Sequence, residues 1–176
     1  MQPLIYHIAT TLDGFIAKPD GGAPGFAMTG EHTDAFVAHL SEYAAIVMGR
    51  ATYEIGYTYG MKPGDLPYGD RPHYIFSESI DLPEKPNLNV VRGDTLAHID
   101  RIKAEAAGPV YLCGGGRFAG YLLAHERIDS LRIKLNPHVY GTGIRLFEEF
   151  DGLKAFTLTH VQRYSTGVVL LDYNRL

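Results

Sequence analysis

The sequence has one cysteine, no tryptophan, no long hydrophobic run and no excess of positive charge. With Cys113 alone, the chain cannot form an internal disulfide, which is typical of proteins from a reducing compartment. Its apolar stretches fall far short of the ~20 residues that a membrane span needs. The first residues do not show a basic segment followed by an apolar one. We therefore expect a cytoplasmic protein that does not bind membranes.

Several function classes are not indicated by the sequence. The 16 basic and 20 acidic side chains give a net charge of −4 without a cationic run, so nucleic acid is not an expected partner. His125 and Glu126 begin a zinc-protease pattern, but Asp129 stands where its second histidine belongs, and we expect no metal site. The sequence also lacks the G-x-S-x-G pattern of hydrolases and a complete P-loop.

The order of apolar segments predicts an α/β fold in a single domain, residues 1–176. Strand patterns alternate with helical patterns and give way to strands alone after residue 131. The expected strands are 4–9, 44–48, 73–76, 88–91 and 110–113, and the expected helices are 34–43, 94–107 and segments beginning near 51 and 118. Alternating segments at 157–164 and 167–173 predict a terminal hairpin. The sheet is therefore expected to be mixed but mostly parallel, with flanking helices and a C-terminal antiparallel hairpin.

Three consecutive glycines, 114–116, stand between the strand pattern 110–113 and a helical pattern. Such a junction brings bare backbone to a helix N-terminus, where N–H groups and the helix dipole favour an anion such as a pyrophosphate. The alternative is a tight turn without a ligand, for which a single glycine would be enough. Three glycines in a row favour binding, since each one costs chain entropy.

A second strand-to-helix junction lies at residues 48–54. Gly49 permits the turn, Arg50 brings a forked positive charge, and Thr52 offers a hydroxyl in the first helical turn. Alone, this pattern is equally typical of an exposed arginine beside a helix start. Two such junctions at the ends of parallel strands predict one ligand at that edge of the sheet.

Two further segments have patterns of interest. Gly114, Gly116 and Ala119 fit G-x-G-x-x-[GA] loosely, but Lys134 stands where a ribose-binding acid is expected, so the Rossmann pattern is weak. Residues 19–30 are rich in glycine and proline and too long for a simple connection, which makes them a candidate lid.

Five motifs together resemble the dihydrofolate reductase-like family, in the branch of the C-terminal reductase domain of the bifunctional riboflavin biosynthesis deaminase-reductase. They are Thr11–Ala17, Met48–Glu54, Tyr74–Ser77, Gly114–Arg117 and Gly141–Phe147. The resemblance covers the whole chain and implies a dihydrofolate reductase-like three-layer fold that binds extended NADPH along the strand ends. The deaminase half of the bifunctional enzyme, with its H-x-E and P-C-x-x-C patterns, is absent from this sequence.

The resemblance also implies the residues of the cofactor site. Gly49, Arg50 and Thr52 would meet the adenosine-side phosphates, Ser77 would approach the 2′-phosphate, and Gly115, Gly116, Arg117 and Phe118 would hold the pyrophosphate. Phe76 is also expected to bind the cofactor. Ala9, Ile16 and Ala17 would line the nicotinamide pocket. Glu78, next to Ser77, leaves the choice between NADPH and NADH open.

For the substrate, the resemblance points to Asp34 and Arg71. Asp34 falls where the family keeps a catalytic carboxylate that supports substrate protonation, although an acidic residue near a helix start is also common for other reasons. Arg71 matches an arginine that holds the folate tail, or is a surface turn residue.

Two functions follow from the resemblance. The first is an NADPH-dependent reductase that transfers a hydride to a small heterocycle, either pterin- or dihydrofolate-like or ribosylaminopyrimidine-like. The second is a protein or sensor that binds NADP(H) without turnover. The apolar terminal strands suggest a homodimer, as in relatives.

Overall fold

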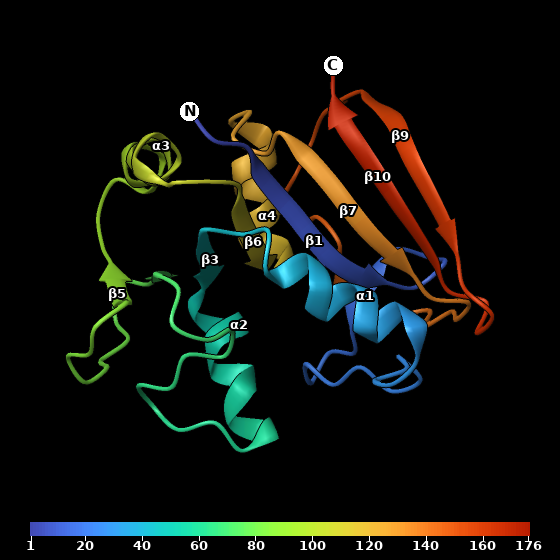
Figure 1. Ribbon diagram of the computed structural model, residues 1–176, viewed down its shortest axis with the longest axis horizontal. Coiled ribbons are helices and arrows are strands. Elements are labelled where there is room, and N and C mark those ends of the chain that lie inside the picture. The colour runs from blue at the N-terminus through green and yellow to red at the C-terminus, as the bar shows by residue number, and fades with distance from the viewer.

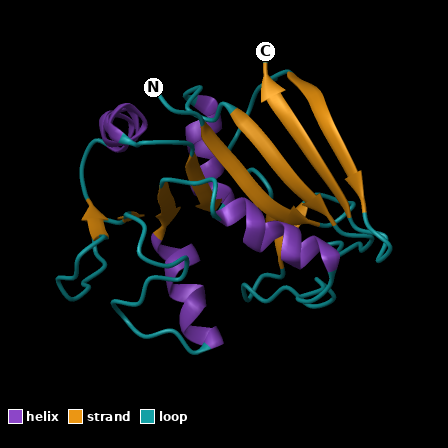
Figure 2. Ribbon diagram, viewed as in Figure 1, coloured by secondary structure: helices purple, strands orange, loops and turns teal.

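The computed structural model describes residues 1–176 and contains one large sheet between two layers of helices (Figures 1 and 2). Its helices are α1 (Glu31–Leu40), α2 (Arg50–Ile55), the 3-10 turn η1 (Gly56–Tyr59), α3 (Thr95–Glu105) and α4 (Gly116–Ala124). Its strands are β1 (Leu4–Thr10), β2 (Phe15–Ala17), β3 (Ala45–Gly49), β4 (His73–Phe76), β5 (Leu88–Val91), β6 (Val110–Gly114), β7 (Ser130–Leu135), β8 (Ile144–Arg145), β9 (Phe156–Arg163) and β10 (Val169–Arg175). No helix combines the length and apolar character needed to cross a membrane.

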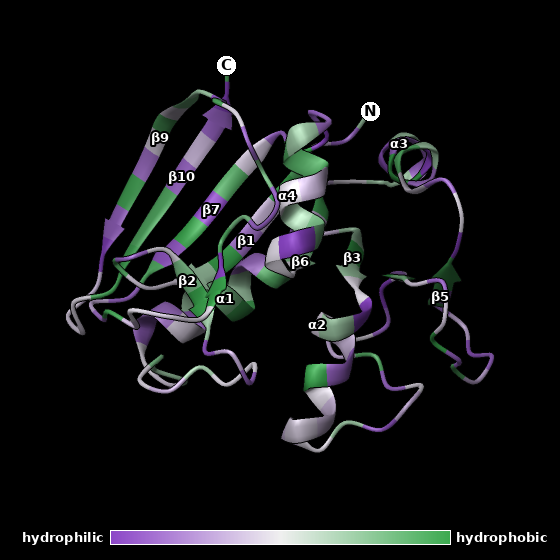
Figure 3. Cartoon of the chain, turned by 180° about the vertical axis from the view of Figure 1, so that it is seen from behind, coloured by the Kyte–Doolittle hydropathy of each residue, from purple (hydrophilic) through white to green (hydrophobic).

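The large sheet has the strand order β5-β4-β3-β6-β1-β7-β10-β9. Neighbours from β5 to β7 run parallel, while β10 is antiparallel to both β7 and β9. The expected mixed, mostly parallel sheet with a C-terminal antiparallel hairpin is confirmed. The hairpin's strands alternate between apolar and polar residues (Figure 3), as a sheet with unlike faces requires.

Each face of the sheet has its own core. On one face, α3 and α4 pack Ile99 and Leu122 against strand residues such as Val47 and Leu112. On the other face, Tyr53 of α2 packs against Ile75 and Met48, with α1 covering the same layer. Every residue of β6 is buried, because this central strand has helices on both sides, and this accounts for its unbroken apolar run.

Differences from the expected elements are local. α1 begins at Glu31, before the expected start at residue 34, and β2 and β8 form a separate antiparallel pair. These two strands span only three and two residues, too short for a periodic pattern to indicate. The predicted N-cap of α3 is confirmed, since the carboxylate of Asp94 accepts a hydrogen bond from the backbone N–H of Ala97 at 3.1 Å.

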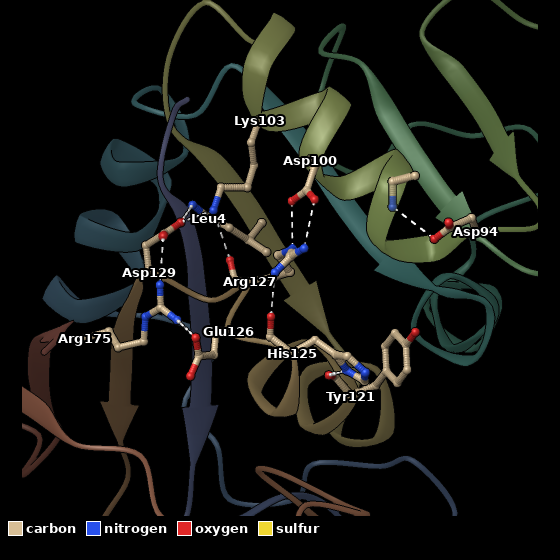
Figure 4. Close-up of polar contacts among 11 residues, drawn as sticks. Leu4, Asp94, Asp100, Lys103, Tyr121, His125, Glu126, Arg127, Asp129 and Arg175 are labelled. Atoms are coloured by element: carbon tan, nitrogen blue, oxygen red, sulfur yellow. Dashed lines mark hydrogen bonds and ion pairs between the residues drawn. The ribbon is translucent and has the colours of Figure 1, made fainter.

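An ionic network holds the edge of the sheet where the parallel strands begin (Figure 4). Lys103 of α3 lies 2.6 Å from the carboxylate of Asp129, and its side chain is only 7% exposed. The same carboxylate accepts a 2.7 Å hydrogen bond from the backbone N–H of Leu4, the first residue of β1. Arg127 donates to Asp100 of α3 at 3.0 Å. Helix α3 is thereby fastened to β1 and β7 at the edge opposite the strand ends where the glycine junctions lie.

Candidate functional site

Two adjoining cavities lie where the parallel strands end. The first has a volume of about 840 Å³ and the second about 410 Å³. Four residues line both cavities: Ile8, Thr52, Ile55 and Cys113. A ligand in one cavity therefore lies next to a ligand in the other.

The two glycine junctions face the first cavity together. β3 and β6 are neighbours in the sheet and pair Met48 with Gly114, so the turns that follow them come to the same edge. Gly49 precedes α2, Gly115 precedes α4, and both line the cavity. The first N–H groups of α4, from Gly116 to Phe118, have no intrahelical acceptor, and no side chain caps them. The junction after β6 thus directs bare donors into the cavity, as an anion site requires.

Close packing also requires the glycines of α4, and the sequence did not indicate this. A Cβ on Gly116 would collide with the carbonyl oxygen of Arg145, and a Cβ on Gly120 would collide with that of Glu148. These two glycines therefore let residues 145–148 pack directly onto the helix. A Cβ on Gly115 would lie 3.1 Å from Oγ1 of Thr52. The hydroxyl of Thr52 and the Gly115 backbone consequently sit together in the wall of the first cavity.

Charged residues of both signs line the first cavity. Arg50 is half-exposed and lies 3.8 Å from Glu54, whereas Arg117 makes a 2.9 Å ion pair with Glu149 at an exposed position. Asp20, Glu148 and Glu149 also belong to the wall and were not expected from the sequence. A phosphate at this site would share Arg117 with Glu149, and Arg50 is the less engaged of the two guanidinium groups.

The loop of residues 19–30 covers both cavities. Pro19, Asp20 and Gly21 line the first, and Ala27 and Met28 line the second. The loop is held from outside by Tyr140, whose hydroxyl donates to the carbonyl oxygen of Pro24 at 2.6 Å and whose ring stacks on Phe26. This placement agrees with the expected lid.

Asp13 lies in the turn after β1 and accepts hydrogen bonds from the segment that contains Tyr140. Partial desolvation raises the pKa of its carboxyl, but hydrogen bonds from the Thr11 hydroxyl and from the backbone N–H groups of Gly141 and Tyr140 outweigh it and lower the pKa to about 2. The ionised carboxylate therefore joins the turn after β1 to the turn at residues 140–141.

The second cavity is aromatic and contains one formal charge. Its wall includes the aromatic side chains Phe36, Tyr53, Tyr59, Tyr68 and Tyr111. Lys134, near the end of β7, is its only lysine or arginine, and no aspartate or glutamate lines it. His7 shares a 3.1 Å hydrogen bond with the Tyr43 hydroxyl. Burial, with the positive charges of Arg132 and Lys134 nearby, keeps the pKa of His7 well below its ordinary value, so the ring is neutral at pH 7.

Cys113 lies between the cavities as a protonated thiol. Its burial raises the pKa of the thiol, despite a 3.1 Å contact with the Tyr68 hydroxyl. A thiolate nucleophile is not supported here, and Cys113 acts as a packing residue. No group of three or more histidine, cysteine or acidic side chains is placed to hold a metal ion.

The residues expected to bind the cofactor converge on the first cavity, with two exceptions. Those in its wall are Ile16, Ala17, Gly49, Arg50, Thr52, Phe76, Gly115, Gly116, Arg117 and Phe118. Ala9 lines the second cavity instead. Ser77 lines neither cavity, because its hydroxyl oxygen accepts hydrogen bonds from the backbone N–H groups of Ser79 and Ile80 at 3.2 and 3.0 Å.

The two residues expected to meet the substrate, Asp34 and Arg71, are not among the residues that line either cavity. Asp34 is exposed on α1, and its neighbour Thr33 lines the second cavity. A helix turns by about 100° per residue, so a shift of one position moves a side chain from the cavity to solvent. Arg71 donates a 2.7 Å hydrogen bond to the carbonyl oxygen of Tyr68 and so stabilises a turn.

Comparison with known proteins identifies the family. The family model described as the RibD C-terminal domain matches residues 2–170. The chain belongs to this family. It is also 27% identical over 167 residues to the uncharacterized protein YwjB of Bacillus subtilis (strain 168), and the match covers 94% of each chain.

Solved structures show the same fold. A putative riboflavin biosynthesis protein from Shewanella sp. PV-4 superposes with a TM-score of 0.79 at 24% identity, over 100% of this chain and 99% of that one. The deaminase/5-amino-6-(5-phosphoribosylamino)uracil reductase of Thermotoga maritima gives 0.75 at 16% identity, over 99% of this chain and 57% of its own. Dihydrofolate reductase from Enterococcus faecalis, complexed with NADP(H) and RAB-propyl, superposes with a TM-score of 0.64 at 19% identity. This match covers 98% of this chain and 96% of that one. This RibD C-terminal domain therefore has a dihydrofolate reductase-like, reductase-type fold.

Proposed function

We propose that this protein is an NADPH-dependent reductase that transfers a hydride to a small heterocyclic substrate. One observation carries the proposal. The two glycine junctions and Arg50 line a single cavity of about 840 Å³, and that cavity adjoins a smaller aromatic one through Ile8, Thr52, Ile55 and Cys113. A long anionic ligand beside a small ring-lined space is the arrangement that a cofactor and its substrate need.

The residues of the first cavity fit an extended dinucleotide. The unpaired N–H groups at the start of α4 and the hydroxyl of Thr52 suit a pyrophosphate, and Arg50 suits a further phosphate. Ile16 and Ala17 supply an apolar wall. NADPH, when bound, supplies the hydride. The protein's part is to align two ligands and to exclude water beneath the loop of residues 19–30.

The substrate is proposed to occupy the second cavity. Pterin-like and ribosylaminopyrimidine-like compounds are the two classes that the family suggests. The absence of any carboxylate from this cavity disfavours substrates that need an acidic partner for an amino-substituted ring, and so disfavours the pterin class. It also favours, as a second candidate function, a protein that binds NADP(H) without turnover, because Asp34 does not reach the cavity.

Two measurements test the proposal. Calorimetric titration of the purified protein with NADPH should show stoichiometric binding, and the absorbance of reduced nicotinamide should then fall when a suitable pterin or ribosylaminopyrimidine is added. Binding without oxidation across both compound classes would support the non-catalytic function. Failure to bind NADPH at millimolar concentration would refute both functions.

We also propose a homodimer formed through the hairpin β9–β10. Leu158 and Val161 of β9 are 48% and 44% exposed, and both pair with apolar partners on β10, Tyr173 and Leu171. Because β9 is the edge strand of the sheet, no further strand of the chain lies on the outer side of this apolar strip.

A further inference from the structure

Lys134 is the one positively charged side chain in the second cavity, and it has no partner. Its neighbours across the sheet are Ala9 on β1 and Leu170 on β10, neither of which offers an acceptor side chain. No carboxylate lies within ion-pair distance of its ammonium group, and none lines the cavity. Burial lowers the pKa of Lys134, and no acidic group acts against that effect. A half-buried ammonium in this position stays incompletely solvated until an anion reaches it.

The other buried or half-buried lysines and arginines have partners. Arg132, two residues earlier on the same strand and face, makes 2.9 Å contacts with both Asp172 and Glu42. Lys103 forms an ion pair with Asp129, and Lys18 donates a hydrogen bond to the carbonyl oxygen of Tyr140 at 3.1 Å. The missing partner at Lys134 is therefore specific to the cavity rather than a general property of this surface.

We infer that the second cavity binds a planar ring compound carrying a single negative charge, of the carboxylate type, and that Lys134 binds that charged group. This inference rests on the proposed function, in which the second cavity holds the substrate. The aromatic wall of Phe36, Tyr53 and Tyr111 suits a ring, and a volume of about 410 Å³ limits the ligand to a small one. The hydroxyl of Thr33, which lines the cavity and is buried without a hydrogen-bond partner, offers a second polar contact.

The charge balance favours a monoanion. One ammonium neutralises one carboxylate in an otherwise uncharged space, whereas the dianion of a phosphate monoester would keep an unpaired charge away from water. No arginine lines this cavity to give the forked contact that phosphate groups commonly use. A neutral amide of the same shape would leave Lys134 unpaired.

The test compares matched ligands on the full-length protein. The probes are uracil-6-carboxylate and pterin-6-carboxylate, the neutral carboxamide of each, and uridine 5′-phosphate as the phosphate monoester. Their dissociation constants are measured by calorimetry for wild type, for Lys134→Met and for Lys134→Arg. Lys154→Met is the control, because Lys154 is paired with Glu126 and lies outside both cavities.

At least one acid should bind wild type tenfold or more tightly than its amide, and more tightly than uridine 5′-phosphate. Lys134→Met should abolish the preference for the acid, while Lys134→Arg and Lys154→Met keep it. Equal binding of acid and amide, or no binding of either acid, would overturn the inference, as would a preference that survives in Lys134→Met. Tighter binding of the phosphate would overturn the monoanion assignment. Thermal unfolding of each variant verifies that it is folded.

A parallel titration with NADPH separates this inference from the reductase proposal. Cofactor binding without a preference for acids would refute the anion site alone. A preference for acids without cofactor binding would refute the reductase and leave the cavity as an anion-binding site of another kind.

Discussion

The backbone N–H of Glu148 donates a 3.0 Å hydrogen bond to the carbonyl oxygen of Gly116. This bond draws the segment after β8 onto the first turn of α4, and the carbonyl oxygen of Arg145 then occupies the space that a Cβ on Gly116 would need. Gly116 consequently belongs to the packing of this segment as well as to the wall of the first cavity.

Replacement of Gly116 by alanine should destabilise the protein by about 1–3 kcal/mol, as is typical when a methyl group is forced into a packed site. Gly49→Ala is the matched control, since its Cβ would lie 3.6 Å from that of Phe118, an ordinary contact, and its φ of −79° suits any residue. Urea denaturation of both variants measures the difference. Equal losses at the two positions would contradict the packing role of Gly116.

Arg50→Ala should weaken NADPH binding about tenfold, because a charge-assisted contact at this half-exposed position contributes roughly 1.4 kcal/mol. If Arg50 contacts the 2′-phosphate, NADH binding should change less. Calorimetry with both cofactors measures this, and Arg163→Ala on exposed β9 serves as the control. Unchanged NADPH affinity in Arg50→Ala would remove Arg50 from the proposed site.

Asp129→Asn should destabilise the protein by about 2 kcal/mol, because it leaves the ammonium of Lys103 buried without its counter-charge. The effect stays below that of a fully buried pair, since the Asp129 side chain is 31% exposed. Glu149→Gln, which breaks the exposed pair with Arg117, should cost less than about 1 kcal/mol. Chemical denaturation that ranks these two variants in the opposite order would be inconsistent with the network in Figure 4.

Stability should fall as the pH drops below about 6.5. The pKa of buried His7 is well below its ordinary value, and burial also lowers that of His39, so below this pH the unfolded chain binds protons that the folded protein does not. Buried His7 then contributes up to about 1.4 kcal/mol per pH unit. His7→Gln should be less stable at pH 7.5 and should show a shallower loss between pH 6.5 and 5. Identical slopes for His7→Gln and wild type would exclude this role for His7.

Leu158→Lys together with Val161→Lys should convert the proposed dimer to a monomer, because the charges would be desolvated at the apolar strip of β9. Gln162→Lys, on the opposite face of the same strand, should leave the assembly unchanged. Sedimentation velocity distinguishes the two states. A wild-type protein that sediments as a monomer would refute the dimer itself.

The sequence by itself determined most of the elements and the two glycine junctions that line the first cavity. The buried run of β6, the apolar spacing of α3 and the glycines at 49 and 115 are local signals, because each depends on the period of the backbone or on its allowed dihedrals. They were enough to predict the mixed sheet and the meeting of the two glycine junctions at one edge, since parallel strands bring their ends to the same edge. Ile16, Ala17 and Phe76 were expected in the same site only from the family resemblance.

Only the tertiary structure decided what depends on neighbours distant in sequence. It placed Thr33 rather than Asp34 at the second cavity. It also showed that the hydroxyl of Ser77 accepts a hydrogen bond within a local turn, and that Glu148 packs onto α4. It also left Lys134 without a counter-charge, although Arg132 on the same strand has two. Burial, charge pairing and close packing depend on contacts between residues that are far apart in the sequence, so no local sequence pattern predicts them.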